Sequence, residues 1–385
     1  MIHLLVTGGM SRPEGESKHQ RISRLLREAI CSGSHPIGAR LPSEARLVQQ
    51  HGVSRPTVMR ALNDLEAEGL IERRMGSGSF VRSARTPPPS GRSLGLLVPG
   101  LGKTEILKRI CGELASVARS QAYELDWGEP ESPESREELD LEGARRLCRH
   151  FIARRVSGVF FAPFELIPDR EEANRILAET LRLEGLPVIL LDRDLGQFPK
   201  RSDFDLVGID NMAAGFLLAE HLIKLGCERL AFVARPNSAS TVDARIAGAR
   251  AAIGNRGLEA DPRWVHLGNP TDVRFVRRLM AGKRWDALLC ANDHTAAELL
   301  QTLAREGHRV PSDVRLVGFD DVRYAALLAT PLTTIHQPCR DIAVVAMRAM
   351  QDRIAESALP ARSHLLTPTL VLGESCGTYR DGGRA

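Results

Sequence analysis

Apolar residues occur at the spacing of α-helices in the first part of the chain. One helix is predicted within residues 18–33, a second follows Ser43 and stops at Gly52, and a third follows Ser54. The inward faces of the first and third helices are formed by Ile22, Leu25, Leu26, Ala29, Val58, Leu62 and Leu65. Ser43 and Ser54 are expected to cap the helices that they precede, because a serine hydroxyl accepts from a free N–H of the first turn.

The second and third helices are joined by a glycine-bearing turn, which predicts a helix-turn-helix. The third helix starts with Arg55 and Thr57 and also carries Arg60. Arginine can donate to two acceptors on a guanine edge at once, so this helix is a candidate for reading DNA bases. Two β-like runs follow, residues 70–74 and 79–82, and they predict a two-stranded wing.

A different pattern begins at residue 94, where short continuous apolar runs alternate with amphipathic stretches. The runs are LGLLV (94–98), VSGVFFA (156–162), PVILLD (187–192), LVGID (206–210), RLAFVA (229–234), DALLCA (286–291) and RLVGF (315–319). Strands that are apolar on both faces, with helices between them, are typical of parallel sheets. About ten such units exceed the usual content of one sheet, so two lobes with parallel doubly wound α/β sheets are expected.

Composition places the boundaries between these parts. Residues 83–93, SARTPPPSGRS, have the proline, serine and glycine content of a linker. We therefore expect a disordered N-terminus at 1–17, an α+β winged domain at 18–82, a linker at 83–93 and a two-lobed domain at 94–380.

Charge is shared unevenly along the 385 residues, although the net charge is only +4. Residues 1–92 hold 14 Lys and Arg against 8 Asp and Glu, whereas residues 93–385 hold 38 against 40. A basic first part on a near-neutral body predicts a polyanion partner for the first part alone.

No sequence pattern indicates a membrane span, a metal site or a disulfide framework. The first apolar run is too short for a signal peptide, and no run approaches the roughly 20 apolar residues of a membrane span, so a cytoplasmic protein with no membrane partner is expected. The seven cysteines never form C-x-x-C, and His221, His294 and His336 share no metal-ligand spacing. Neither a disulfide framework nor a metal site is predicted.

Residues 98–105, VPGLGKTE, contain Gly102-Lys103-Thr104, the same three letters that close a nucleotide-binding P-loop. That motif needs a glycine at position 97, where this chain has Leu97, and Pro99 lacks the N–H that the phosphate cradle would use. A strand turning into a helix near Lys103 is the favoured interpretation. An enzyme with a nucleotide site at 98–105 is a distant alternative, and with no other catalytic motif present we expect neither an enzyme nor a cofactor.

The segment LPSEARLVQQHGVSRPTVMRALNDLEAEGLIERRMGSGSFV resembles the winged helix of GntR-family transcription regulators, over nearly all of residues 18–82. The resemblance implies that Arg55 and Thr57 contact DNA and that the wing tip enters the minor groove. Ala45 and Met59 replace arginines that are common in the family, with Arg46 and Arg60 beside them, so a different operator is expected. The candidate DNA-binding residues are Ser43, Arg46, Ser54, Arg55, Thr57, Arg60, Arg74, Gly76, Ser77 and Gly78.

Polar residues gather at the carboxyl ends of the predicted strands, where doubly wound sheets bind ligands. These are Asp192-Arg193, Asn292-Asp293 and Asp320-Asp321, and Arg245 opens a helix. Carboxylates, an amide and a guanidinium suit a small polyhydroxylated ligand, with Phe161, Phe164 and Phe319 as apolar walls. Asp293 and Asp321 are expected to cap the helices that follow them rather than to bind.

The body resembles the effector domain of LacI/GalR-type repressors, which is similar to periplasmic sugar-binding proteins. The segments that carry this resemblance are VSGVFFAP, VILLDRD, VGIDN, RIAG, LLCANDHTA, LVGFDDV and PLTTIHQP. It implies that Arg245, Asn292 and Asp320 contact the effector, that Asp192 lines the cleft and that Gln337 lies near the hinge. The candidate effector-binding residues are Phe161, Asp192, Arg245, Asn292, Phe319, Asp320 and Gln337, with residues 100–104 at the cleft mouth.

The resemblance departs from the family's usual pattern at two places in the first lobe. Ala162 stands where a polar contact is common, and the first strand ends in PGLGK without the usual Asp or Ser. The class of ligand is therefore open at this stage.

Together these features predict a dimeric transcription regulator that binds a palindromic double-stranded DNA operator. We expect a repressor that a small sugar or sugar derivative releases from DNA. An activator or a co-repressed regulator of the same build is the alternative.

Overall fold

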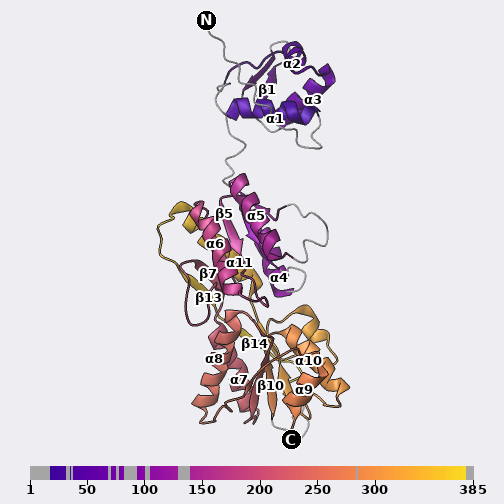
Figure 1. The fold of residues 1–385 in the computed structure, drawn as a ribbon, viewed down its shortest axis with the longest axis vertical. Helices are drawn as coiled ribbons and strands as arrows, with labels where there is room; N and C mark the ends of the chain where they lie inside the picture. Colours follow the sequence, from indigo (N-terminus) through magenta and orange to yellow (C-terminus); the bar gives the residue numbers. More distant parts are fainter. Residues whose placement is uncertain are drawn as a thin grey trace. The chain divides into compact units, whose positions relative to one another are not determined.

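The computed structural model describes residues 18–31, 35, 38–67, 71–74, 78–81, 93–99, 105–128, 139–282 and 285–378. The chain divides into two compact units, Met1–Gly91 and Arg92–Ala385, and each is considered by itself (Figure 1). The predicted disordered N-terminus, all but the last residue of the predicted linker, the wing residues Gly76 and Ser77 and the cleft-mouth residues 100–104 lie outside the described residues.

The first unit is a three-helix domain with a two-stranded wing, as predicted. Its elements are α1 (Lys18–Cys31), α2 (Glu44–His51), α3 (Arg55–Ala67), β1 (Ile71–Arg74) and β2 (Gly78–Val81). The strands pair antiparallel, with Ile71 opposite Val81. Val58, Leu62 and Leu65 are fully buried in the small core that α3 forms with α1 and α2.

Helix α2 has the two ends that its sequence predicts. The Ser43 hydroxyl accepts from the N–H of Arg46 at 3.3 Å, which satisfies one free donor of the first turn. Gly52 ends the helix in the left-handed conformation, with φ 61° and ψ 39°, where a side chain is disfavoured. These ends set the turn between α2 and α3.

The first lobe of the second unit is built on a six-stranded, all-parallel sheet of order β13-β7-β6-β5-β3-β4. Its strands are β3 (Ser93–Leu97), β4 (Glu124–Asp126), β5 (Gly158–Phe161), β6 (Val188–Leu191), β7 (Asp205–Ile209) and β13 (Ser363–Leu366). Its helices are α4 (Glu105–Ser120), α5 (Leu141–Arg154), α6 (Arg170–Leu183) and α11 (Cys339–Ala355). Helices α4 and α11 pack together on one face, and α5 and α6 on the other.

The second lobe has a four-stranded parallel sheet of order β11-β10-β8-β9. Its strands are β8 (Leu230–Ala234), β9 (Val265–Leu267), β10 (Ala287–Cys290) and β11 (Arg315–Val317). Helices α7 (Asn211–Lys224) and α8 (Ser240–Asn255) lie on one side of this sheet, and α9 (Val273–Met280) and α10 (Asp293–Arg305) on the other (Figure 1). A short 3₁₀ turn, η2 (Arg323–Leu327), follows β11.

Three segments cross between the lobes. They are the step from β7 into α7, the step from β12 (Thr334–His336) into α11, and the step from β13 to β14 (Thr369–Val371). Strands β12 and β14 pair antiparallel beside the second lobe. The predicted two-lobed architecture is thus confirmed, with the carboxyl ends of both sheets next to the crossing segments.

Helices α7 and α8 approach each other unusually closely. A Cβ placed on Gly215 would overlap the carbonyl oxygen of Arg245, and a Cβ on Gly248 would overlap the carbonyl oxygen of Met212. Glycine at both positions lets the two backbones touch. This contact fixes the position of Arg245 relative to the start of α7.

No helix in the described part of the chain is long and apolar enough to cross a lipid bilayer. Among the same residues, no three His, Cys, Asp or Glu side chains are grouped so that they could hold a metal ion.

Candidate functional site

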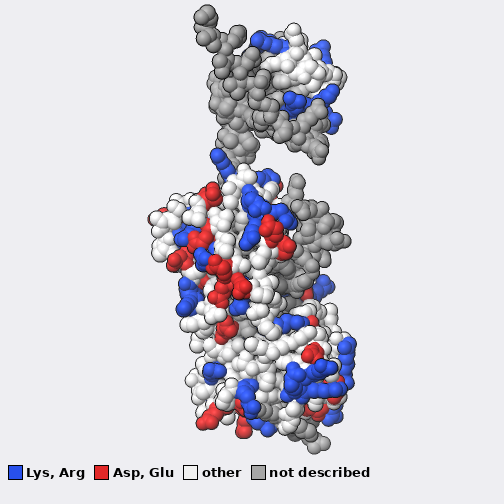
Figure 2. Space-filling model, in the orientation of Figure 1, with Lys and Arg blue, Asp and Glu red and all other residues white. Residues whose placement is uncertain are grey.

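The start of α3 carries the first candidate site, an exposed face of the first unit. Arg46, Arg55 and Arg60 are all exposed. On the visible face of this unit, the charged side chains that the structure describes are Lys and Arg (Figure 2). The Ser54 hydroxyl shares a hydrogen bond of 2.7 Å with the Thr57 hydroxyl. Of the predicted DNA-binding residues that the structure describes, Ser54, Arg55, Thr57 and Arg60 lie in the first turns of α3 or next to them, Ser43 and Arg46 lie at the start of α2, and Gly78 lies on β2. Their contact with DNA stays a prediction.

Glu44 organises this face, and the sequence analysis did not identify it. Its carboxylate pairs with Arg55 Nε at 3.1 Å and with Arg73 Nη2 at 2.6 Å. Arg73 also donates to the Asn63 side chain at 2.6 Å. Glu44 thus ties the first residue of α3 to strand β1 and limits the directions that the Arg55 fork can take.

The wing is described in part. Gly78 has a φ of 106°, which favours glycine, and the Arg40 side chain lies against it. Gly76, Ser77 and the side chain of Arg74 lie outside the described part of the chain, so the predicted wing tip stays a prediction.

The second candidate site surrounds Arg245, a buried residue in the first turns of α8. Its Nε donates to Asn211 Oδ1 at 2.8 Å, and its Nη1 donates to the Ala291 carbonyl at 2.5 Å. The guanidinium lies 3.4 Å from the centre of the Phe319 ring, which is a cation–π contact. Arg245 is therefore held on three sides.

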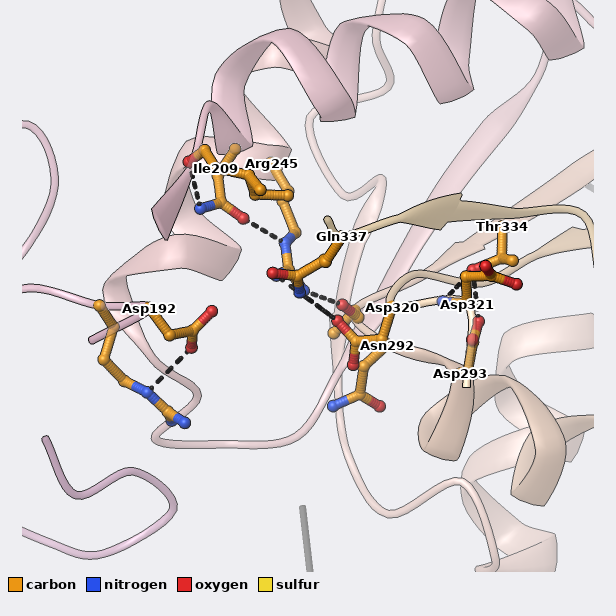
Figure 3. Close-up of polar contacts among 12 residues, drawn as sticks. Asp192, Ile209, Arg245, Asn292, Asp293, Asp320, Asp321, Thr334 and Gln337 are labelled. Carbon is orange, nitrogen blue, oxygen red and sulfur yellow. Dashed lines mark hydrogen bonds and ion pairs between the residues drawn. The ribbon is translucent and has the colours of Figure 1, made fainter. Parts of the chain in front are cut away.

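Asp320 and Gln337 complete the cluster. Asp320 Oδ1 lies 4.0 Å from Arg245 Nη2 and accepts from Gln337 Nε2 at 2.8 Å. Figure 3 shows these three side chains converging, with Asp192 apart from them. Burial raises the pKa of Asp320 to about 8, against the opposing effect of the Arg245 charge.

The first lobe supplies Asp192 and Arg193 at the end of β6. Arg193 pairs with Glu165 at 2.5 Å and with Asp192 at 3.2 Å. Asp192 and Arg193 are each less than 10% exposed, and Asp192 Oδ1 has no hydrogen-bond partner. An unmatched buried carboxylate oxygen is a place where a ligand hydroxyl can donate.

The backbone at the site adopts unusual conformations. Asp192, Asp320 and Asp321 have φ values of 68°, 112° and 50°, in the region that side chains disfavour. Such strain costs about 1–3 kcal/mol at each residue and tends to persist at functional sites. Its presence at aspartates from both lobes is consistent with a ligand site at this cluster, which stays a prediction.

The predicted capping roles of Asp293 and Asp321 are wrong. The N-cap of α10 is Asn292, whose Oδ1 accepts from the N–H of Thr295 at 2.8 Å. Asp293 is instead fully buried and accepts from the Thr334 hydroxyl at 2.7 Å and from the N–H of Val322 at 3.0 Å. Asp321 pairs with His336 Nδ1 at 2.7 Å, and the turn that follows it has no side-chain cap.

Asp293 makes the stability of the second unit depend on pH. Burial raises its pKa to about 7, against the Thr334 hydroxyl and nearby backbone N–H groups that favour the charged form. The native state therefore binds more protons than the unfolded state between about pH 4 and pH 7, so stability falls as pH rises through this window. Urea unfolding of the wild type at pH 5, 6, 7 and 8 should show a falling free energy of unfolding, and Asp293→Asn should make this slope shallower, leaving the part that Asp320 contributes through its raised pKa. An equally steep slope in the variant would assign the effect to another group.

The structure does not bring all the predicted residues to the cluster. Phe319 lies beneath Arg245, as expected of an apolar wall, whereas Phe161 and Phe164 are buried in the core of the first lobe. Asn292 lies near Asp320 with its side-chain oxygen used as the helix cap (Figure 3). Two residues absent from the prediction belong here: Asn211, which holds Arg245, and Glu165, which holds Arg193.

A basic winged helix joined to a two-lobed domain with a polar, strained cluster between its lobes defines a ligand-responsive transcription regulator. Residues 18–81 match the bacterial regulatory proteins of the gntR family, and residues 219–376 match the periplasmic binding protein-like domain. The chain is thus a regulator with a GntR-type DNA-binding domain and a periplasmic binding protein-like effector domain.

Several known proteins are similar over most of the chain. The arabinose metabolism transcriptional repressor of Geobacillus stearothermophilus is 24% identical, over 93% of this chain and 97% of that protein. The HTH-type transcriptional regulator GalR of Salmonella typhimurium is 26% identical, over 86% and 95%. The structure of a transcriptional regulator CelR–cellobiose complex shares the fold, with a TM-score of 0.63 and 23% identity over 84% of this chain and 91% of that one.

Proposed function

We propose that this protein is a repressor that binds a two-fold DNA operator as a homodimer and leaves it when a small sugar enters the effector domain. The observation that carries this proposal is the Arg245 cluster. A guanidinium stacked on an aromatic ring, with a carboxylate and an amide beside it, offers donors and acceptors at fixed angles to the hydroxyls of a sugar.

Residues from both lobes take part, which gives the ligand a way to act. Arg245 and Asp320 belong to the second lobe, and Asp192 follows a strand of the first. A ligand that contacts all three favours the closed arrangement over the open one, and only such a difference in affinity can shift the equilibrium between them. The relatives named for arabinose metabolism and the solved cellobiose complex support a sugar as the ligand.

The homodimer follows from the size of the DNA site. One helix-turn-helix reads only half of a typical operator, so two copies with half-sites about one helical turn apart are needed. Closure of the lobes in each copy would change the spacing of the two DNA-binding domains and so their affinity for the operator.

The test starts with an operator selected from random DNA with the full-length protein. Fluorescence anisotropy on this operator, with and without a panel of sugars, should find a sugar that weakens binding by about 5- to 150-fold, the usual range of allosteric coupling. Light scattering should show two chains on each operator. If every sugar tightens binding, the protein is co-repressed instead, and a single chain on the full operator would exclude the dimer.

Arg55→Ala separates reading of bases from attraction to phosphates. If Arg55 contacts a base edge, the variant should lose about 1–3 kcal/mol of binding to the selected operator and become indifferent to one base pair in each half-site. Its binding to random DNA should change much less. Arg145→Ala, at an exposed arginine of α5, serves as the control of equal charge. Equal losses on specific and random DNA would make Arg55 a phosphate contact.

A further inference from the structure

A pocket beside the Arg245 cluster is not used by the site described above. It lies between the loop that follows β6, strands β7 and β13, and the starts of α7 and α8. Its volume of about 220 Å³ is below the range of about 300–1,000 Å³ for complete small-molecule sites, so it has the size of one part of a larger site.

The pocket adjoins the cluster at Asn211. Asp192 and Asn211 line it, and Asn211 is the residue that holds Arg245 Nε. One buried polar atom of these lining residues, Asp192 Oδ1, has no hydrogen-bond partner. A hydroxyl of a ligand in the pocket could donate to it.

The outer wall of the pocket is apolar and exposed. Phe198, Met212 and Leu365 line it and are 38%, 45% and 50% exposed, which is high for large apolar side chains. The loop that carries Phe198 is held by Asp194, which accepts from the N–H of Ser202 at 3.2 Å and pairs with Arg201 at 3.2 Å. A lining that combines apolar side chains with hydrogen-bonding groups suits a sugar ring, which has both apolar faces and hydroxyl groups.

The charges in the wall favour a neutral ligand over an anion. Asp192, Asp194 and Asp210 are balanced by Arg193, Lys200 and Arg201. Arg193 and Arg201 are already paired with carboxylates, so the pocket offers no cluster of free positive charge.

We propose that this pocket is a second subsite, which binds the second ring of a neutral disaccharide whose first ring occupies the Arg245 cluster. This inference rests on the proposed function. It narrows the proposed effector from sugars in general to disaccharides. Phe198 and Leu365 provide the apolar surface for the second ring, and Asp192 lies where the two rings meet.

The experiment compares matched sugars on the full-length protein by isothermal titration calorimetry. Glucose is compared with cellobiose and maltose, galactose with lactose, and glucose 6-phosphate is included as an anion. The wild type should bind one of the disaccharides at least tenfold more tightly than its monosaccharide. In the double variant Phe198→Ala, Leu365→Ala this ratio should fall about tenfold, whereas Leu183→Ala, at an exposed leucine of α6 outside the pocket, should keep it.

Each of the other possible outcomes contradicts one specific part of the proposal. Equal affinity for mono- and disaccharides, or an unchanged ratio in the double variant, removes the second subsite and leaves the sugar-responsive repressor intact. A preference for glucose 6-phosphate that the double variant loses would make the pocket an anion site. If no sugar binds to protein that still binds its operator, the carbohydrate effector and the subsite both fail. Thermal unfolding of each variant confirms that it is folded.

Discussion

Replacing Arg245 with alanine is expected to weaken effector binding by about 3 kcal/mol, roughly 150-fold in Kd. The variant loses a charged donor set and leaves Asp320 without its nearest cation in a buried place. Binding of DNA without effector should persist, because Arg245 belongs to the second unit, and the DNA-binding residues to the first. Operator titrations would be run with and without the sugar that releases the wild type from DNA. They should show that the Arg245→Ala variant stays on DNA at sugar concentrations that release the wild type.

Arg250→Ala is the matched control for this experiment. Arg250 lies on the same helix, α8, but is exposed and packs over Trp264 rather than over the cluster. The Arg250→Ala variant should be released from the operator at the same sugar concentration as the wild type. An Arg245→Ala protein that is released at the wild-type sugar concentration would place the effector site elsewhere.

Gly248→Ala is expected to destabilise the second unit by about 3 kcal/mol, at the upper end of overpacking effects. The added methyl group would overlap the backbone oxygen of Met212, and a backbone atom of a packed helix cannot move aside as the end of a side chain does. Helices α7 and α8 must separate, which also displaces Asn211 from Arg245. Urea unfolding should show a lower midpoint, and the remaining folded protein should bind sugar more weakly.

Gly254→Ala on the same helix controls for the substitution itself. No atom lies within 4 Å of a Cβ at this position, so alanine should stabilise the helix by up to about 1 kcal/mol. If Gly248→Ala were as stable as Gly254→Ala, the close approach of the two helices would be disproved.

The strands that could be predicted are those that are buried on both faces. All seven apolar runs became β-strands, and β5, β6 and β10 are fully buried along their length. The unpredicted strands are β4, β9, β12, β13 and β14, each of three or four residues. Strand β13 alternates exposed and half-buried positions, and its place at the sheet edge depends on pairing with β7, far away in the sequence. A short, half-exposed run carries too little apolar signal to reveal such pairing.

The candidate site divides in a similar way. Residues at strand ends, such as Asp192 and Asp320, could be located because the carboxyl ends of parallel strands share one edge. Asn211 could not be located from the sequence, because its contact with Arg245 depends on two glycines that bring α7 and α8 together. Asp293 was misassigned as a cap because sequence shows where a helix starts within a residue or two, but not which neighbour turns inward.

The strand order of the first lobe has a consequence for synthesis of the protein. Strand β7 ends at Ile209, but its neighbour β13 begins at Ser363, after the whole second lobe has been made. At about 5–20 residues per second, the ribosome needs roughly 8–30 s to bridge this interval. During that time β7 is a bare sheet edge, which can pair with another chain. The nascent regulator is therefore expected to pass through an aggregation-prone stage that ends when β13 emerges and pairs with β7.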